Sequence, residues 1–315
     1  MVKCSVCVKK KSIEKKNIGK YVKSHIWLYL LILPGALYFI IFHYVPMFGV
    51  VIAFQDYSPY LGFLKSPFVG LKHFRNFFIG SDFGMLLKNT LLLSIYSLVF
   101  YFPAPIIAAL LLNEIKSQVY KRTVQTLIYV PHFVSYVIVA SLTYTLFNVN
   151  DGIMHEFIQK ITGNNIDVLA SAKYFRTLIV GQSIWKETGY GTIVFLAALS
   201  GVDMDLYDAA RVDGAGRWKL MWHITLPAIR GTIVIMLILR MGTILNTGYD
   251  QIFLMRNDLN RSAAEVFDTY VYTRGISQAQ YSLSTAVGIF KSIVSTILIL
   301  GTNKIAKLCG ESGIY

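Results

Sequence analysis

The chain has 315 residues, of which 55% are hydrophobic, and its formal net charge is +13. This composition excludes an ordinary soluble protein and indicates a polytopic membrane protein. The positive charge could suggest nucleic-acid binding, but the basic residues gather at the ends of apolar runs, and membrane topology explains that pattern better.

The N-terminal tail, residues 1–25, is strongly basic, with eight lysines against the single acidic residue Glu14. By the positive-inside rule, this end of the chain is expected in the cytosol. The tail also holds Cys4 and Cys7, and Cys309 follows the last apolar run. With all three cysteines on the cytosolic side, no disulfide is expected. The lone Cys4-x-x-Cys7 pair is a weak metal motif.

The apolar runs are long enough for six membrane spans. The first is too long for a signal-peptide core and is expected to remain as an anchor, kinked by Pro34 and Pro46. The predicted spans run from Ile26 to about Phe54, Leu86 to Leu112, Val124 to Phe147, Phe175 to Leu199, Pro227 to Met255 and Ser282 to Leu300.

The loops between these spans are expected to alternate between the two sides, with both termini cytosolic. Residues 55–85 are interpreted as an outer loop with a short interfacial helix, and residues 256–280 as an external loop. Three arginines lie in that external loop. They reduce, but do not reverse, the excess of basic residues on the cytosolic side that supports this topology. The chain then divides into a basic cytosolic tail (1–25), a first transmembrane helix with its outer loop (26–85), a core domain (86–308) with a cytosolic loop at 201–227, and a cytosolic C-terminal tail (309–315).

A polar stretch from Asp208 to Pro227 interrupts the apolar chain. Its first part favours helix, and Gly214 and Gly216 then break the run where a tight turn or a close contact is needed. Pro227 suits the first turn of a second helix, which has no use for the missing N–H. A rigid loop of this kind, with small side chains, is suited to docking against another protein.

The spacing within this stretch resembles the cytoplasmic coupling loop of ABC importer permeases. That loop has the pattern Glu-Ala-Ala, three residues, Gly, about nine residues, Ile-x-Leu-Pro. Here Asp208-Ala209-Ala210 precedes Gly214 by three residues, and nine residues later the chain continues as Ile224-Thr225-Leu226-Pro227. The shorter Asp208 replaces the usual glutamate. The resemblance implies an all-α membrane protein with the type I ABC importer permease fold and six transmembrane helices; the alternative is a generic helix-turn-helix loop.

Further segments resemble the carbohydrate branch of these permeases, associated with polysaccharide and complex oligosaccharide uptake. They are Tyr44 to Tyr57, Asp250 to Leu254, and Asp268 to Tyr272 continuing through Tyr281 to Gly288. The resemblance implies a multi-pass subunit of the bacterial cell membrane that imports oligosaccharides or polysaccharide fragments. It also implies three kinds of partner: a second, different permease subunit, two ATPase subunits and an extracellular solute-binding protein. It does not specify the saccharide.

No enzymatic role is expected for this chain. It has no Gly-x-x-x-x-Gly-Lys-Ser/Thr loop, so ATP and Mg²⁺ should be bound by the partner ATPase and no cofactor by this chain. Its six histidines form no paired ligand motif, so neither a metal site nor catalytic residues are predicted. One alternative is a secondary transporter driven by an ion gradient, although no internal repeat supports it; another is an ABC importer for a non-sugar solute.

Two sets of functional residues are predicted. Small side chains in the coupling loop would permit close approach to the ATPase, although Gly214 alone could simply turn the chain. Aromatic and amide side chains near the membrane could bind sugar rings and hydroxyls, although aromatic residues are also common at membrane interfaces. The ATPase-coupling residues are Asp208, Ala209, Ala210, Asp213, Gly214, Gly216, Leu226 and Pro227, and the substrate-path residues are Trp185, Lys186, Tyr190, Asn246, Tyr249 and Gln251.

Four charged residues fall near the middle of predicted spans: Lys186, Glu187, Arg240 and Lys291. A charge there costs at least about 2.5 kcal/mol, so each should face the bundle interior, a partner or a water-filled path. Adjacent residues point about 100° apart on a helix. We therefore expect Glu187 to pair with Arg240 between the fourth and fifth spans and Lys186 to face the cavity or the other permease. The alternative is that these groups only stabilise helix packing.

Overall fold

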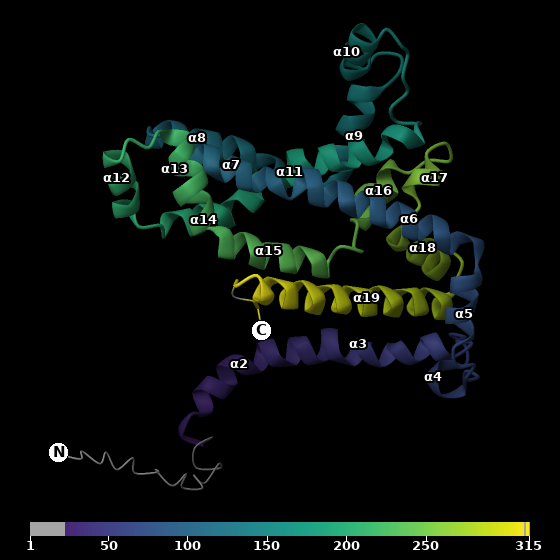
Figure 1. Ribbon diagram of the computed structural model, residues 1–315. Coiled ribbons are helices and arrows are strands. Elements are labelled where there is room, and N and C mark those ends of the chain that lie inside the picture. Colours follow the sequence, from purple (N-terminus) through teal and green to yellow (C-terminus); the bar gives the residue numbers. More distant parts are fainter. Residues whose placement is uncertain (1–22, 312, 315) are drawn as a thin grey trace, which may run out of the picture. The chain divides into compact units, whose positions relative to one another are not determined.

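The computed structural model describes residues 23–311, 313 and 314, and these residues are almost entirely helical (Figure 1). Turns and short loops join the helices, and within this part of the chain the only β-type pairing is an isolated antiparallel bridge between Gln55 and Phe68. The all-α prediction is therefore confirmed. Cys4, Cys7 and the lysines of the tail up to Lys20 lie outside the described residues. The chain divides into two units, one ending at Val51 and one from Ile52 onward.

The first unit is formed by an apolar helical path. It comprises α2 (Ile26–Phe39), the π-helical segment η1 (Ile40–Tyr44) and α3 (Val45–Met47), after which the 3-10 segment η2 (Phe48–Phe54) leads into the second unit. Residues 26–54 are long and apolar enough to cross a membrane, which agrees with the predicted first span. Helix α2 stays α-helical through Pro34, whereas the residues just before Pro46 form the wider π-helical turn η1.

The second unit begins with two short helices that lead into a long apolar one. The chain from α6 to α7 is also long and apolar enough to cross a membrane, as predicted. These elements are α4 (Gly62–Lys65), α5 (Lys72–Ile79), α6 (Ser81–Tyr96), η3 (Ser97–Tyr101) and α7 (Pro103–Asn113).

The expected third span is not one straight helix. The path of α8 (Gln118–Tyr129) and the 3-10 segment η4 (Val130–Phe133) meets α9 (Tyr136–Phe147) at a bend of 98°. Pro131 lies in η4, and the Ser135 hydroxyl accepts a hydrogen bond from the Ile138 N–H, starting a new helix after the bend. The short helix α10 (Ile153–Thr162) follows.

The helix α11 (Ala172–Ser200) is the centre of the second unit. It contacts α6, α7, α8 and α17, as well as η3 and η4 (Figure 1). Although it has 29 residues, it is not among the helices that are apolar enough to be candidate spans. Its charged residues, which include Lys186 and Glu187, lower its hydropathy.

A loop with one exposed helix follows α11. The elements are α12 (Met204–Val212), α13 (Arg217–Leu220), the π-helical η5 (Met221–Thr225), α14 (Leu226–Ala228) and α15 (Arg230–Gly242). The continuous helical segment from α13 to α14 meets α15 at a bend of 58°. The second helix of the polar stretch was expected to begin at Pro227. It begins ten residues earlier, at Arg217, because the preceding Gly216 has an extended backbone conformation that allows a new helix to start there. Pro227 lies instead just before the bend.

The expected fifth span also differs from the structure, because the helix breaks after Gly242. Residues 261–277, part of the predicted external loop, form short helical segments that pack into the core, and Phe267 is completely buried. The helical segments after Gly242 are α16 (Tyr249–Met255), α17 (Arg261–Ala264), α18 (Phe267–Tyr272) and η6 (Thr273–Ser277), followed by α19 (Tyr281–Leu308). Helix α19 contacts α5, α15 and α18 and is apolar enough to be a span, as predicted.

Three of the π-helical segments share one cause. Each ends two residues before a proline: η1 before Pro46, η3 before Pro103 and η5 before Pro227. A proline has no N–H to give to the carbonyl four residues earlier, and that carbonyl lies inside the π-helical segment each time. The preceding residue bonds five residues back instead, as the Phe102 N–H does to the Ser97 carbonyl at 3.0 Å.

Candidate functional site

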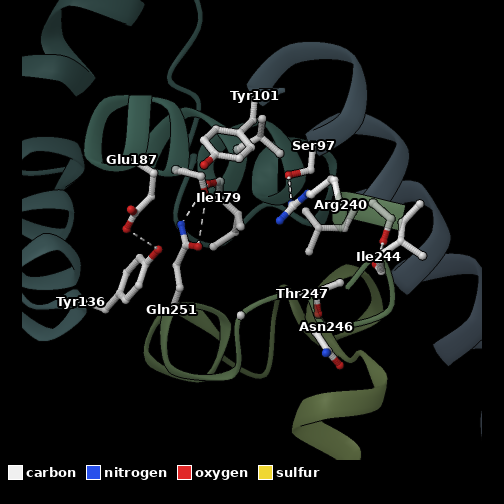
Figure 2. Close-up of a pocket in the computed structure, with 15 residues that line it drawn as sticks. Ser97, Tyr101, Tyr136, Ile179, Glu187, Arg240, Ile244, Asn246, Thr247 and Gln251 are labelled. Atoms are coloured by element: carbon white, nitrogen blue, oxygen red, sulfur yellow. Dashed lines mark hydrogen bonds between the residues drawn. The ribbon is translucent and has the colours of Figure 1, made fainter. Parts of the chain in front are cut away.

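A polar cavity of about 150 Å³ lies where α6, η3, α9, α11 and the end of α15 meet (Figure 2). The broken stretch after Gly242 closes one side of it. Its apolar wall includes Leu93, Ile179 and Val180. The polar side chains that line it are Ser94, Ser97, Tyr101, Tyr136, Ser183, Glu187, Arg240, Asn246, Thr247 and Gln251.

Arg240, at the end of α15, extends into this cavity toward η3 (Figure 2). Its guanidinium donates to the Ser97 hydroxyl at 3.0 Å and lies 5.4 Å from the centre of the Tyr101 ring. No carboxylate among the described residues forms an ion pair with it. Its two neighbours are therefore a hydroxyl and an aromatic ring.

Glu187 forms a cluster with residues on both sides of the 98° bend. One of its oxygens lies 2.7 Å from the His132 Nδ1 atom of η4, and the other accepts from the Tyr136 hydroxyl at 3.4 Å. Lys186 donates to Glu187 at 2.9 Å and to the His132 carbonyl at 2.7 Å. The cluster thus joins α11 to the bend through charge-assisted hydrogen bonds.

The expected Glu187–Arg240 ion pair is therefore wrong for this structure. Both residues line the same cavity, but Glu187 is already paired with Lys186 and His132. Lys186 was expected to face the cavity or the other permease, but it does not line the cavity and is buried within this chain, with only 6% of its surface exposed. The long lysine side chain bends toward its neighbour, so the 100° between adjacent residues does not separate the two charges. Lys291, the fourth predicted charge, pairs with Asp268 of α18.

The predicted substrate-path residues divide into two groups. Asn246 and Gln251 line the cavity (Figure 2). Gln251 is fixed in its wall, because its amide donates to the Ile179 carbonyl at 2.8 Å and to the Gln182 side chain at 2.9 Å. The side chain of Asn246 has no hydrogen bond to the described residues.

The three aromatic residues of the predicted substrate path lie away from this cavity. Trp185 faces a separate, largely apolar groove of about 610 Å³ between α9, α10 and α11. The Tyr190 ring stacks on His132, with centroids 4.1 Å apart. Tyr249 packs against Phe253 and Tyr272. Their place on a predicted span could not show which face of the helix they occupy.

Several cavity residues were missed from the sequence. Ser94, Ser97 and Tyr101 lie three and four residues apart on the path from α6 to η3, a spacing that places them on one face of a helix. Polar residues at that spacing in an apolar run were the signal that could have found them. His132 had no comparable signal, because its partner is 55 residues away in the sequence.

The second candidate site is the loop containing α12. The Asp203 side chain accepts from the Asp205 N–H at 3.0 Å and starts the helix. At its other end Gly214 adopts a φ of +77°, and the Ala215 N–H bonds to the Ala210 carbonyl at 2.9 Å. The Tyr207 hydroxyl donates to Thr225 at 3.0 Å, which holds α12 against η5. The loop is thus a defined structure.

Most of the predicted coupling residues lie at the surface of this loop. Asp208 is exposed and pairs with Arg211 one turn on at 2.8 Å. Large apolar side chains are exposed beside them, including Val212 at 89% and Trp218 at 71%. Ala209, Asp213, Gly214, Gly216 and Pro227 are exposed, whereas Ala210 and Leu226 are half-buried.

Long apolar helices around a polar cavity, with an exposed helical loop between them, are typical of a membrane transport protein. Residues 101–307 match the family of binding-protein-dependent transport system inner membrane components. The chain belongs to this family and is an inner membrane permease component.

Two relatives from Bacillus subtilis (strain 168) cover nearly the whole chain. Protein LplB is 58% identical over 294 residues, which are 93% of this chain and 92% of that protein. The polygalacturonan/rhamnogalacturonan transport system permease protein YteP is 51% identical over 306 residues, 97% of this chain and 95% of that protein. The structure is also similar to a chain of a bacterial alginate ABC transporter crystallised with an alginate pentasaccharide-bound periplasmic protein. That match has a TM-score of 0.86 and 37% identity and covers 94% of this chain and 99% of that one.

Proposed function

We propose that this chain is the transmembrane permease subunit of an ATP-driven, binding-protein-dependent ABC importer for oligosaccharides or polysaccharide fragments. The family match establishes the permease role, and the polar cavity inside the helical core supports a hydrophilic solute. The named saccharide systems among its relatives support the substrate class. The single observation that carries the proposal is this cavity, formed by side chains from α6, α9, α11 and α15.

Under this proposal the chain crosses the membrane six times, with both termini in the cytosol. Three apolar helices and two bent helix pairs supply five of these spans. Helix α11 is the sixth: its 29 residues extend about 43 Å at 1.5 Å per residue, enough to cross a bilayer. Its charged residues are tolerated because Lys186 and Glu187 pair with each other inside the core.

We propose α12 and the turn after it as the surface that docks on the ATPase. The exposed apolar side chains beside Gly214 support a protein partner, since this surface has no cover within the described chain. The contact between Tyr207 and Thr225 would let a movement of α12 pass directly to η5 and α15. ATP and Mg²⁺ would be bound by the ATPase, and this chain would not be an enzyme.

The complete importer would contain a second, different permease subunit, two ATPase subunits and an extracellular solute-binding protein. The similar alginate transporter was crystallised in complex with a periplasmic protein, which supports the last of these partners.

The docking surface is tested by Gly214→Asp. It should abolish saccharide uptake and reduce co-purification of the ATPase while the chain remains in the membrane. Gly163→Asp is a matched control, because Gly163 also has a positive φ, +69°, and open space where a Cβ would lie, with no atom within 4 Å, but is located at the end of α10. Normal uptake by Gly214→Asp, or equal loss in both variants, would contradict the assignment.

The transport function is tested by reconstituting the chain with its ATPase, partner permease and binding protein in vesicles. Saccharide should enter only when ATP and the binding protein are both present. Uptake that follows an ion gradient without the ATPase would overturn the proposal.

A further inference from the structure

The Arg240 guanidinium is the unusual feature of the polar cavity. The two buried lysines nearby each form an ion pair with a carboxylate: Lys186 with Glu187, and Lys291 with Asp268. Arg240 has only the Ser97 hydroxyl and the face of Tyr101 as neighbours. A cation inside a membrane protein is costly unless an anion or water balances it. An anionic ligand in the cavity would supply this balance.

The charge balance of the lining supports the same conclusion. Glu187 is the only acidic residue among those that line the cavity within the described chain. Its negative charge is balanced by Lys186, and a second cation-capable group, His132, lies 2.7 Å from it. The remaining formal charge in the cavity is the positive charge of Arg240. An incoming anion would meet an attractive group there.

The neighbouring groups are suited to a saccharide. A guanidinium presents several N–H donors in one plane and can bind both oxygens of a carboxylate at once. Only one hydrogen bond from Arg240 to a side chain is formed, so further donors remain for a ligand. The Tyr101 ring, which lies beside Arg240 in the same wall, offers a flat apolar surface for a sugar face (Figure 2).

We propose that the cavity binds a carboxylate-bearing sugar, a uronic acid unit, and that Arg240 binds its carboxylate. This inference rests on the proposed function and narrows its substrate class. Arg240 would act as a specificity-determining residue, favouring acidic over neutral saccharides on their way through the membrane.

The test compares two probes in vesicles that contain the complete importer. One is a trisaccharide of uronic acids, and the other is the same trisaccharide with its carboxyl groups methyl-esterified. Uptake is measured for the wild type, Arg240→Gln and Arg240→Lys. The binding protein is the same in every sample, so its own selectivity cancels when each variant is divided by the wild type for the same probe.

Arg240→Gln should reduce uptake of the uronate at least tenfold more than uptake of the ester, and Arg240→Lys should restore part of the uronate uptake because it keeps the charge. If the wild type imports only the uronate, the expected result is loss in Arg240→Gln and partial recovery in Arg240→Lys. An equal reduction for both probes, equal activity of the two variants, or a wild type that imports only the ester would overturn the inference. A wild type that imports no saccharide would overturn the proposed function instead.

Discussion

The His132 Nδ1 atom lies 2.7 Å from a Glu187 carboxylate oxygen and thereby connects the segment before the 98° bend to the middle of α11. The Tyr136 hydroxyl reaches the same carboxylate from the other side of the bend. Glu187 thus contacts both helices that meet there. A carboxylate contributed by a different helix therefore links the two parts of this broken span.

Removing Glu187 should destabilise the protein because it leaves Lys186 buried without a counterion. For Glu187→Leu we expect a loss of about 3–5 kcal/mol in the free energy of unfolding. The double variant Lys186→Met/Glu187→Leu removes both charges and should recover much of this loss. Thermal unfolding of the purified variants in detergent measures the effect. A double variant no more stable than Glu187→Leu would show that the unpaired lysine is not the cause.

Exchanging the charges of Glu187 and Arg240 should not rescue function. Glu187→Arg places a cation beside Lys186, and Arg240→Glu places a carboxylate beside Ser97 and Tyr101. Because the two residues have different partners, the losses should add rather than cancel. Membrane level and saccharide uptake are compared for both single variants and the double variant. Recovery in the double variant would show that the two residues do pair in some state of the transport cycle.

Gly189 permits the close approach of α11 to α8. A Cβ atom at this position would lie 1.9 Å from the Ile128 carbonyl oxygen, so Gly189→Ala must push backbone apart. We expect a loss of about 3 kcal/mol or more and a lower level of folded protein in the membrane. Gly181→Ala is the control, because Gly181 lies on the same helix with nothing within 4 Å. Similar behaviour of the two variants would contradict the packing argument.

The ion pair between Asp268 and Lys291 should matter more than the exposed pair between Asp56 and Lys72. Asp268→Asn keeps an oxygen that can accept from the Thr247 N–H but leaves Lys291 without its counterion. We expect a loss of about 3 kcal/mol, against less than about 1 kcal/mol for Asp56→Asn.

Unfolding at pH 7 measures this difference. The hydrogen bond from Lys72 lowers the pKa of Asp56, so that carboxylate is charged at this pH and its pair would be lost only in acid, as the pH falls through the lowered value. The comparison at pH 7 is therefore between two formed ion pairs. Equal losses in the two variants would show that the burial of the Asp268 pair is unimportant.

The sequence predicted those parts of the fold that depend on local patterns. The apolar helices at residues 26–54, 81–113 and 281–308 follow from unbroken apolar runs. Breaks that depend on tertiary contacts were not predictable. Helix α15 ends at Gly242 because side chains of other helices bind the backbone of residues 243–248. Ser94 donates to the Ile244 carbonyl, and Asp268 accepts from the Thr247 N–H. Residues 261–277 are polar enough to be interpreted as a loop, yet they pack into the core.

The same distinction between local sequence patterns and tertiary contacts applies to the candidate site. Asn246 and Gln251 were predicted because their amide groups can hydrogen-bond the hydroxyls of a sugar. The pairing of Glu187 was not, since depth in a span locates a charge along the helix but does not indicate which neighbour it faces. His132 lies beside a bend whose angle cannot be predicted from the local sequence. It forms the contact with Glu187 that was expected of Arg240.

The wide turn at η3 sets which residues of that helix can face the cavity. Ser97 and Tyr101 are its first and last residues, and both line the space around Arg240. A π-helical turn contains one residue more than an α-helical turn, which changes the rotational phase of the helix by about 100° on one side of it. Pro103, which does not line the cavity, thus determines the orientation of one cavity wall. Without that proline the segment would be free to close into a regular α-helix, which would present a different set of side chains to the cavity.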